Sequence, residues 1–455
     1  MKLFTLSVFS VAAVSSIWAQ APQESIELDL ATTLRLVDER NTDLAIALET
    51  IQQAEIASKQ AWYQWLPTLR AGLAYSEQNG PLQQTDGRII EVDRQADSVG
   101  IGVPFSGAGM APVPGIALEV NLVDAIYDLK IAGQNETIAR ANREEARFLR
   151  AMDAVQGYFH LVLAAKSVAL HEQALEEATA LAKTTGEFAK AGEGLEADAD
   201  RAAVEETLRK YRLEQARYQQ VAASAKLASL LKLPTYQQLN LQADALVPLT
   251  IYQEKPDIPE SIKLALQNRP AIEEVAARLE ASRLEADRTK RSPFIPKLGA
   301  GYSYGEFSDQ GDFSSGRLGE RQETFVYLYW SLDNLGFGNH ATNQHRESEL
   351  RQLELRMEQV EVDMSIRIQT AIAEMETTRA QLSILEIGLA NARNGYELSR
   401  KRIFENQGLP LEALDAFKSL AEIELLYAET IAKFNTSQLF LLGATGKEIS
   451  VKAKD

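Results

Sequence analysis

The most constraining feature of the sequence is an internal repeat that spans half of the chain. Trp65–Tyr75 reads W-L-P-T-L-R-A-G-L-A-Y and Phe294–Tyr304 reads F-I-P-K-L-G-A-G-Y-S-Y, so that P, L, A, G and Y recur at one offset. A repeat of this length indicates two similar structural units in one chain. In both copies a helical spacing of apolar residues gives way to alternation just after the proline. This change predicts that each unit passes there from helix into strand.

Alternating apolar residues predict two strands in each copy. The expected strands cover 68–76 and 116–123 in the first copy and 297–307 and 324–333 in the second. Each has about ten residues, which suits a tilted strand that crosses a bilayer. Between the first two strands, the segment Ser76–Gly115 contains many Gly and Pro residues and is interpreted as a loop.

Each strand pair is followed by a long helical hairpin, expected at 128–232 in the first copy and at 339–442 in the second. A helix of about 60 residues is a rod of roughly 90–100 Å, because the rise is about 1.5 Å per residue. In the second copy two series of apolar residues follow a seven-residue repeat with one slip, which is typical of a coiled-coil seam. The first series is Leu350, Met357, Met364, Ala371, Thr378, Leu385 and Ala392, and the second is Leu353, Val360, Ile368, Met375, Leu382, Leu389, Tyr396 and Ile403.

The composition disfavours several classes of function. A formal net charge of -17 disfavours a nucleic-acid partner, because phosphate backbones are bound by clustered Lys and Arg. The chain has no Cys, so that no disulfide, thiolate metal site or lipid-modified cysteine is expected. Lys2, an apolar run and small residues up to Ala19 predict a secretory signal and an exported protein. No later segment has about 20 consecutive apolar residues for a spanning helix, so we expect any contact with a membrane to be made by strands.

These elements predict a mainly α fold with a small β part. The interleaving of strands and helices in duplicated halves argues for one intertwined body, although length alone suggests about three domains. The expected units are the signal peptide (1–19), the first repeat (20–234), a connector (235–258), the second repeat (259–446) and a polar tail (447–455).

Four strands cannot close a barrel within one chain. An open sheet edge in lipid leaves backbone N–H and C=O groups unpaired, at a cost of several kcal/mol each. Closure therefore requires several copies of the chain. Three copies give twelve strands, an even number within the range of outer-membrane barrels, and two or four copies also close.

The order of the motifs resembles the TolC-like outer-membrane efflux protein family. The resemblance rests on the repeated P-x-L-x-A-G segments, on W-S-L-D-N-L-G-F-G at Trp330–Gly338, on the glycine turns between the rods and on L-L-G-A-T-G at Leu441–Gly446. It implies a homotrimer with a twelve-strand β-barrel in the outer membrane and an α-helical tunnel that extends into the periplasm. It also implies a periplasmic adaptor protein and, through it, an inner-membrane pump as partners, and no cofactor. Lipid-anchored members carry a cysteine after the signal, which this chain lacks.

The resemblance also implies a gate where the rods end. The segment E-A-L-D-A at Glu412–Ala416 is similar to the family pattern D-V-L-D-A, and Asp198 opens a similar segment in the first copy. Glu412 and Asp415 are three residues apart, so both can lie on one side of a helix. Around a symmetric tube they would form acidic rings that favour cations. Gly408 stands two residues nearer this pair than in the family pattern, which leaves the register open. The alternative is a solvated first helical turn, where carboxylates favour the positive end of the helix dipole.

Two further groups are expected to have positional roles. The turns between the rods resemble the family's periplasmic tip, where adaptors dock, although an ordinary helix–helix turn would carry the same glycines. The predicted tip residues are Gly192, Gly194 and Gly408. Tyrosines on the strands are expected at a membrane interface, where Tyr and Trp gather. These residues are Tyr75, Tyr302 and Tyr304.

The sequence has no convincing enzyme or metal motif. His340 and His345 are five residues apart and lack the H-E-x-x-H spacing of zinc enzymes. We expect a passive outer-membrane exit duct of a tripartite efflux or secretion system, gated at the periplasmic helix tips, with no enzymatic activity and no metal. The alternative is a soluble periplasmic coiled-coil scaffold or adaptor without a barrel, against which the four strands argue.

Overall fold

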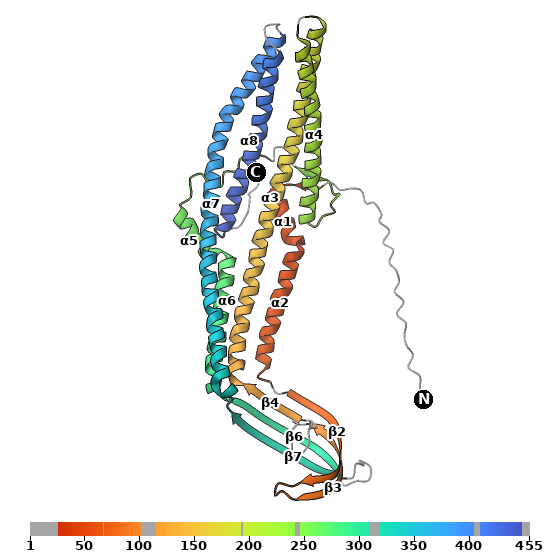
Figure 1. Ribbon diagram of the computed structural model, residues 1–455, viewed down its shortest axis with the longest axis vertical. Coiled ribbons are helices and arrows are strands. Elements are labelled where there is room, and N and C mark those ends of the chain that lie inside the picture. The colour runs from red at the N-terminus through yellow and green to blue at the C-terminus, as the bar shows by residue number, and fades with distance from the viewer. Residues whose placement is uncertain are drawn as a thin grey trace, which may run out of the picture.

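The computed structural model describes residues 26–66, 68–101, 115–192, 194–241, 246–309, 318–404 and 410–447. The predicted signal, Pro67 and Gly408 lie outside the described residues. Figure 1 shows an elongated molecule with helical rods towards one end and a curved sheet at the other. The chain is mainly helical with a small β part, as predicted. None of the described helices is long and apolar enough to span a membrane.

Four long helices form two antiparallel hairpins. They are α3 (Leu122–Lys190) with α4 (Glu196–Leu230), and α7 (Phe337–Phe404) with α8 (Pro410–Ala444). α3 begins at Leu122 rather than at the expected residue 128, because Asn121 caps it. The Asn121 side-chain oxygen accepts hydrogen bonds from the N–H groups of Val123 and Asp124. The strand that was expected to reach residue 123 therefore ends at Asn121.

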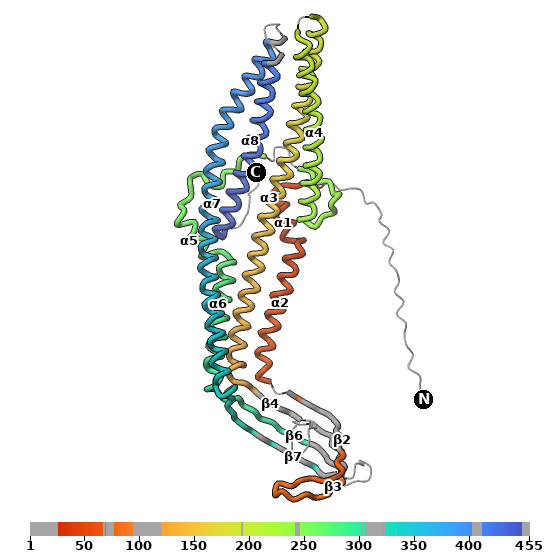
Figure 2. The backbone as a smooth tube through the Cα atoms, in the orientation of Figure 1, coloured from red at the N-terminus to blue at the C-terminus, as the bar shows by residue number. Residues whose placement is uncertain are grey.

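Each repeat also has a pair of shorter helices that leads into the sheet. They are α1 (Leu30–Arg40) and α2 (Thr42–Tyr63), and α5 (Ile258–Asn268) and α6 (Pro270–Arg291). Asn41 separates the first pair and caps α2 with its side-chain oxygen. Arg269 separates the second pair, and Pro270 follows it at a position where a helix needs no N–H partner. Figure 2 shows α2 beside α3 and α6 beside α7, so the two repeats share this arrangement.

The register of the sheet reveals four strand positions. The strands are β2 (Thr68–Gln83), β3 (Ile89–Ile101), β4 (Gly115–Asn121), β6 (Lys297–Asp309) and β7 (Leu318–Tyr329). Ala71 of β2 pairs with Ile101 at the end of β3, and the adjacent Arg70 pairs with Gly115 at the start of β4. β6 likewise pairs with β3 and then with β4. β3 and β4 therefore occupy one strand position, which residues 102–114 interrupt.

The interpretation of Ser76–Gly115 as a loop was wrong for most of its length. β2 continues to Gln83 and β3 returns from Ile89. The turn between them contains Asp86-Gly87, and Gly87 has a φ of +85°, a conformation that favours glycine. An Asp-Gly pair between alternating apolar residues is a hairpin signal, and here it sets a ladder that pairs residues 71–83 with 89–101.

The second strand of the second repeat is displaced from its expected range. β7 begins at Leu318 and ends at Tyr329, whereas residues 324–333 were expected. Trp330 leaves the sheet, and its indole N–H donates a hydrogen bond to the carbonyl of Phe294 at 3.3 Å. Asn334 and Leu335 then adopt left-handed conformations before α7 starts.

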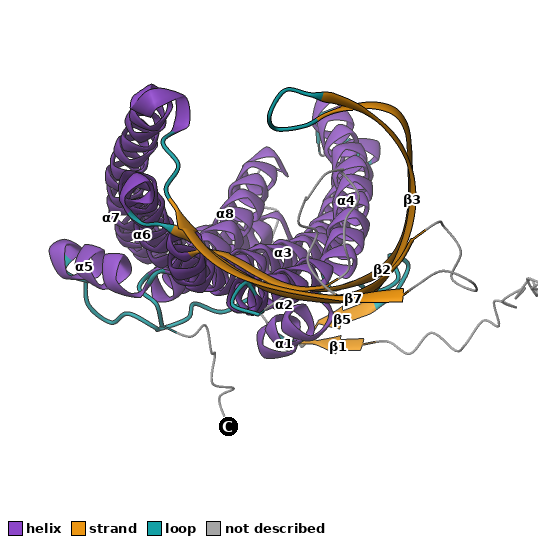
Figure 3. Ribbon diagram, turned by 90° about the horizontal axis from the view of Figure 1, so that it is seen from below, coloured by secondary structure: helices purple, strands orange, loops and turns teal. Residues whose placement is uncertain are grey.

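The connector packs along α8, near the middle of the rods. The buried amide of Asn435 accepts a hydrogen bond from the Leu249 N–H at 2.8 Å, and the buried amide of Gln438 accepts one from the Ile251 N–H at 3.0 Å. Within the connector, β5 (Leu239–Leu241) pairs in parallel with β1 (Ile26–Leu28). Two clusters of buried apolar side chains join the rods and the connector. Figure 3 shows the sheet as an open arc, with α4 and α7 at opposite ends of the row of rods.

Candidate functional site

The turn between α3 and α4 is built on two glycines. Gly192 has a φ of +77°, in the left-handed region that favours glycine. A Cβ on Gly194 would lie 3.3 Å from the Cβ of Phe188, so the turn folds tightly against the end of α3. Both predicted glycines of the first tip are thus explained by backbone geometry. Gly408, from the second tip, lies outside the described residues.

Of the three acidic residues predicted for the gate, Asp198 and Glu412 lie in the first turns of α4 and α8, and Asp415 lies in the second turn of α8. Glu412 and Asp415 are both exposed and three residues apart, so they share one side of α8. The carboxylate of Glu412 is 3.3 Å from the guanidinium of Arg402 on α7. The carboxylate of Asp198 is 3.5 Å from the guanidinium of Arg201. Glu412 and Asp198 therefore each have a basic neighbour, whereas Asp415 forms no ion pair with another described residue.

Below the tips, polar and aromatic side chains join the two hairpins. The hydroxyl of Tyr396 on α7 donates a hydrogen bond to Glu177 of α3 at 2.6 Å, and Arg400 lies 3.5 Å from the same carboxylate. Burial raises the pKa of Tyr396, and the hydrogen bond to Glu177 raises it further, so the phenol remains a donor at neutral pH. Glu177 is about 20 Å from the end of α3, from the helical rise.

A buried ion pair on α4 makes the second contact between the hairpins. The carboxylate of Glu205 lies 2.7 Å from the guanidinium of Arg209 and 3.3 Å from the ammonium of Lys418 on α8. The side chains of Glu205 and Arg209 are 7% and 3% exposed. The guanidinium of Arg209 also stacks 4.9 Å from the ring centre of Phe417. We call this set the inter-hairpin cluster. Its members are Glu177, Glu205, Arg209, Tyr396, Arg400, Phe417 and Lys418.

Sequence reasoning missed the inter-hairpin cluster. Glu205 and Arg209 have the spacing of an ion pair on one helix, and Tyr396 was recognised only as a member of a heptad series. Neither pattern identifies the partner hairpin, because that depends on how α3 packs beside α8. A charged pair four residues apart next to otherwise apolar seam positions was the available signal.

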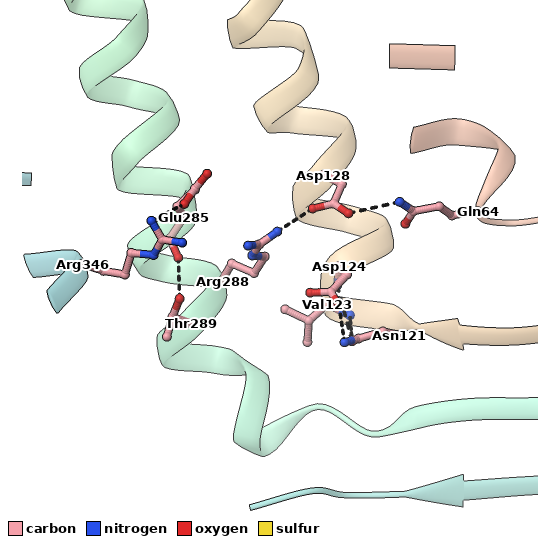
Figure 4. Close-up of polar contacts among 9 residues, drawn as sticks. All are labelled: Gln64, Asn121, Val123, Asp124, Asp128, Glu285, Arg288, Thr289 and Arg346. Carbon is pink, nitrogen blue, oxygen red and sulfur yellow. Dashed lines mark hydrogen bonds and ion pairs between the residues drawn. The ribbon is translucent and has the colours of Figure 1, made fainter. Parts of the chain in front are cut away.

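A polar network holds the helices together immediately above the sheet. Figure 4 shows Asp128 of α3 between two donors, Arg288 of α6 and Gln64, which directly follows α2. The hydrogen bonds are 2.6 Å from Arg288 and 3.1 Å from Gln64. The guanidinium of Arg346 on α7 lies 2.8 Å from the carboxylate of Glu285 on α6. One network therefore connects α2, α3 and α6, and an ion pair connects α6 to α7. Both hold the helix ends at which the chain enters or leaves the sheet.

Exposed aromatic side chains gather where the rods meet the sheet. They lie close to the first residues of β2 and β6 and the last residue of β7, and sequence reasoning missed them. We call them the junction aromatics, and they are Trp62, Tyr63, Trp65, Phe294, Trp330 and Phe337. Of the predicted interface residues, Tyr302 and Tyr304 are exposed further along β6. The side chain of Tyr75 lies outside the described part of the structure.

The groups described above are ion pairs, hydrogen bonds and ring contacts between helices. Among the described residues, no three His, Asp or Glu side chains are grouped to hold a metal ion. The inter-hairpin cluster consists of ion pairs, a hydrogen-bonded phenol and a cation stacked on a ring. Each of these contacts breaks and re-forms without covalent change, so the arrangement suits a mechanical role at the tips.

Known proteins share this fold. A family model described as outer membrane efflux protein matches residues 261–446, which lie within the second repeat. Curated protein sequences give no significant match. The outer-membrane channel OprN is similar over 92% of this chain and 90% of its own, with 17% identity and a TM-score of 0.79. VceC from Vibrio cholerae is similar over 92% and 97%, with 13% identity and a TM-score of 0.77. MtrE from Neisseria gonorrhoeae is similar over 92% and 89%, with 18% identity and a TM-score of 0.74.

Proposed function

We propose that this chain, a TolC-like outer-membrane efflux protein by its family match and its fold, forms the outer-membrane exit duct of a tripartite efflux or secretion system. The observation that carries the proposal is the direct join of a curved sheet to rods of 69 and 68 residues in one chain. A sheet of this kind suits a membrane wall, and rods of about 100 Å suit a tunnel. The duct is passive, since the pump supplies the work, and it catalyses no reaction.

The assembly is a homotrimer. One chain supplies four strand positions in an open arc, and an open sheet edge cannot be left in lipid. Three copies supply twelve positions, which is within the range of outer-membrane barrels. The rods of the three copies then surround one tunnel.

The junction aromatics support a placement in the membrane. Trp and Tyr gather at membrane–water interfaces, and these exposed residues are close in sequence to the strand ends that join the rods. The sheet then lies in the outer membrane and the rods extend into the periplasm. The tips at Gly192, Gly194 and Gly408 are the sites where a periplasmic adaptor docks, and through it an inner-membrane pump.

Gating takes place at the tips. Glu412, Asp415 and Asp198 of three copies make acidic rings, and the inter-hairpin cluster holds the two hairpins of each copy together. To open, α7 and α8 have to move away from α3 and α4. That movement breaks the hydrogen bond from Tyr396 to Glu177 and the ion pair of Lys418 with Glu205.

The test is to purify the protein from outer membranes, run it unheated on a denaturing gel and measure its conductance in a planar bilayer. We expect a trimer band and stepwise conductance. A soluble monomer without conductance would refute the proposal and favour a periplasmic scaffold or adaptor, which the fold comparisons do not support.

A further inference from the structure

A cavity of about 890 Å³ lies between the two hairpins of the chain. It is nearer to the sheet than the inter-hairpin cluster is, because the α3 residues that line it precede Glu177. All four rod helices line the cavity, and each contributes a small residue, which are Gly157, Ala223, Ala371 and Ala432. Small side chains on four neighbouring helices leave a space that larger ones would fill. The volume lies within the range of small-molecule sites, about 300–1,000 Å³.

The cavity lies on the side of the rods that faces away from the connector. On α8 the connector binds to Asn435 and Gln438, whereas the cavity is lined by Glu429, Lys433 and Phe440. The two sets lie on opposite sides of α8, because each residue turns a helix by about 100°. Figure 3 shows β5 of the connector outside the arc of the sheet, on its convex side. The cavity is therefore on the concave side, which faces the tunnel in the proposed assembly.

The floor of the cavity is apolar. Its larger apolar side chains come from all four rod helices and are Phe159, Leu163, Leu230, Ile366 and Phe440. Phe159 is a buried member of one of the two apolar clusters that join the rods and the connector, and Leu163 and Phe440 pack against that cluster. The floor is thus a fixed part of the core. An apolar floor with a few polar groups around it is typical of a site for a small organic molecule.

Three basic side chains line the cavity and have no acidic partner among the described residues. We call them the cavity cations, and they are Lys226 of α4, Arg367 of α7 and Lys433 of α8. All three are exposed. Each chain has a formal net charge of -17, so unpaired basic groups on a tunnel wall are a local exception that attracts an anion. Charged N–H donors form strong hydrogen bonds with anionic oxygens.

The acidic residues of the lining favour a ligand with a single negative charge. The carboxylate of Asp153 already has a partner, because the guanidinium of Arg150 lies 2.9 Å away. Glu374 and Glu429 are exposed and form no ion pair within the described part of the chain. Their carboxylates repel a second negative charge on a ligand and accept a hydrogen bond from a donor group.

We propose that this cavity binds a small amphipathic organic anion that reaches it from the tunnel. The apolar body lies on the floor between the two hairpins, and the anionic group lies against the cavity cations. This proposal rests on the proposed function, because the cavity faces a tunnel only in the assembled duct. The cavity itself is complete within one chain, so binding can be measured whether or not the duct assembles.

Protection of a cysteine from labelling tests the site, and the chain has no cysteine that could interfere. Gln156→Cys places a thiol in the cavity lining, at an exposed position of α3. The matched control is Gln173→Cys, because Gln173 is exposed on the same helix but outside the cavity lining. The probe is 8-anilinonaphthalene-1-sulfonate, which has an aromatic body, one sulfonate and one N–H donor. It should slow the reaction of a maleimide with Gln156→Cys and leave the reaction of Gln173→Cys unchanged.

Replacement of the cavity cations tests the charge of the ligand. When all three are changed to Gln in the Gln156→Cys protein, half-protection should need about tenfold more probe. The control changes three exposed basic residues outside the cavity to Gln, and it should leave the half-protection concentration unchanged. These residues are Lys210, Lys263 and Arg351. N-Phenyl-1-naphthylamine, which lacks only the sulfonate, should protect poorly at the same free concentration. Circular dichroism and the unheated trimer band verify that each variant folds and assembles.

The outcomes separate this inference from the proposed function. If the sulfonate protects Gln156→Cys no better than Gln173→Cys, the site is refuted and the duct stands. If the neutral probe or the variant without cavity cations gives the same protection as the sulfonate with the original cations, the preference for an anion is refuted. If the unmodified protein is a soluble monomer without conductance, the proposed function fails, and protection of Gln156→Cys in that monomer still decides whether the cavity binds the probe.

Discussion

At the scale of single residues, the buried His171 should make the stability of the protein depend on pH. His171 is buried on α3, and its pKa is lowered from 6.5 by burial and then by the positive charges of Arg209 and Arg212. The unfolded chain therefore protonates this histidine more readily than the folded chain does. Above about pH 6.5 the unfolded chain binds little of this proton, so the histidine does not reduce the free energy of unfolding. Stability then falls as the pH drops below that value. His171→Gln should lose part of this acid sensitivity.

The measurement for His171 is the melting temperature as a function of pH between about 8 and 5. His160→Gln is the matched control, because His160 is exposed on the same helix. An equal loss of melting temperature below pH 6.5 in the His171 variant and in the unmodified protein would contradict the expectation.

Lys418 should hold the tips in the closed position. Its ammonium is the α8 partner of the buried Glu205, while Arg209 pairs with Glu205 within α4. Lys418→Met removes the attraction between the hairpins and leaves the α4 pair intact, so we expect a higher mean conductance with little loss of stability. Arg209→Met removes a buried partner and should cost about 3–5 kcal/mol of stability. The control is Lys210→Met, and a conductance of Lys418→Met equal to that of this control would refute the role of Lys418.

At the scale of elements, the strand position that β3 and β4 share can be tested by deletion. Ile101 and Gly115 pair with the adjacent residues Ala71 and Arg70, so deletion of residues 102–114 joins two ends that already share one strand position. This deletion variant should still form a trimer that stays intact on an unheated denaturing gel. Deletion of residues 102–115 is the matched control. It shifts β4 by one residue and turns every side chain to the opposite face, which should abolish the trimer. Similar behaviour of the two deletions would contradict the register.

The long elements were predictable, because their patterns are regular over many residues. Heptad spacing predicted the hairpins, and the repeated proline and alternation predicted that helices pass into strands near Pro67 and Pro296. The β2–β3 hairpin was missed although Asp86-Gly87 marks its turn, because the Gly- and Pro-rich tract after Ile101 suggested one long loop. The end of β7 was misplaced because Trp330 continues the alternation but hydrogen-bonds to Phe294 instead of pairing in the sheet.

At the scale of the whole molecule, the sequence predicted acidic residues near the rod ends, and it did not predict the contacts that join the two hairpins. The acidic residues Glu412, Asp415 and Asp198 were chosen from a local pattern that resembles the family's, and the structure places them in the first two turns of α8 and the first turn of α4. The contacts of Glu205 with Lys418 and of Glu177 with Tyr396 join segments more than 200 residues apart. Such pairs depend on the packing of one repeat against the other, for which a single sequence carries no signal.

The charge of the whole molecule should make the duct selective for cations. Each chain has a formal charge of -17, and three chains around one tunnel create a negative potential that raises the local concentration of cations. A salt gradient across a planar bilayer should therefore give a reversal potential of the sign that favours potassium over chloride. The potential should decrease at high salt, because the Debye length falls from about 10 Å at 0.1 M to about 3 Å at 1 M.

The contribution of the proposed acidic rings to ion selectivity can be measured separately from that of the total charge. If Glu412 and Asp415 line the narrowest part of the duct, Glu412→Ala with Asp415→Ala should reduce the reversal potential well beyond the small change in total charge, because charges at a constriction dominate selectivity. The matched control is Asp86→Ala, which removes an exposed acidic residue at the far end of the molecule, in the β2–β3 turn. A double variant with unchanged conductance and unchanged reversal potential would place these carboxylates on the solvated first two turns of α8, outside the path of the ions.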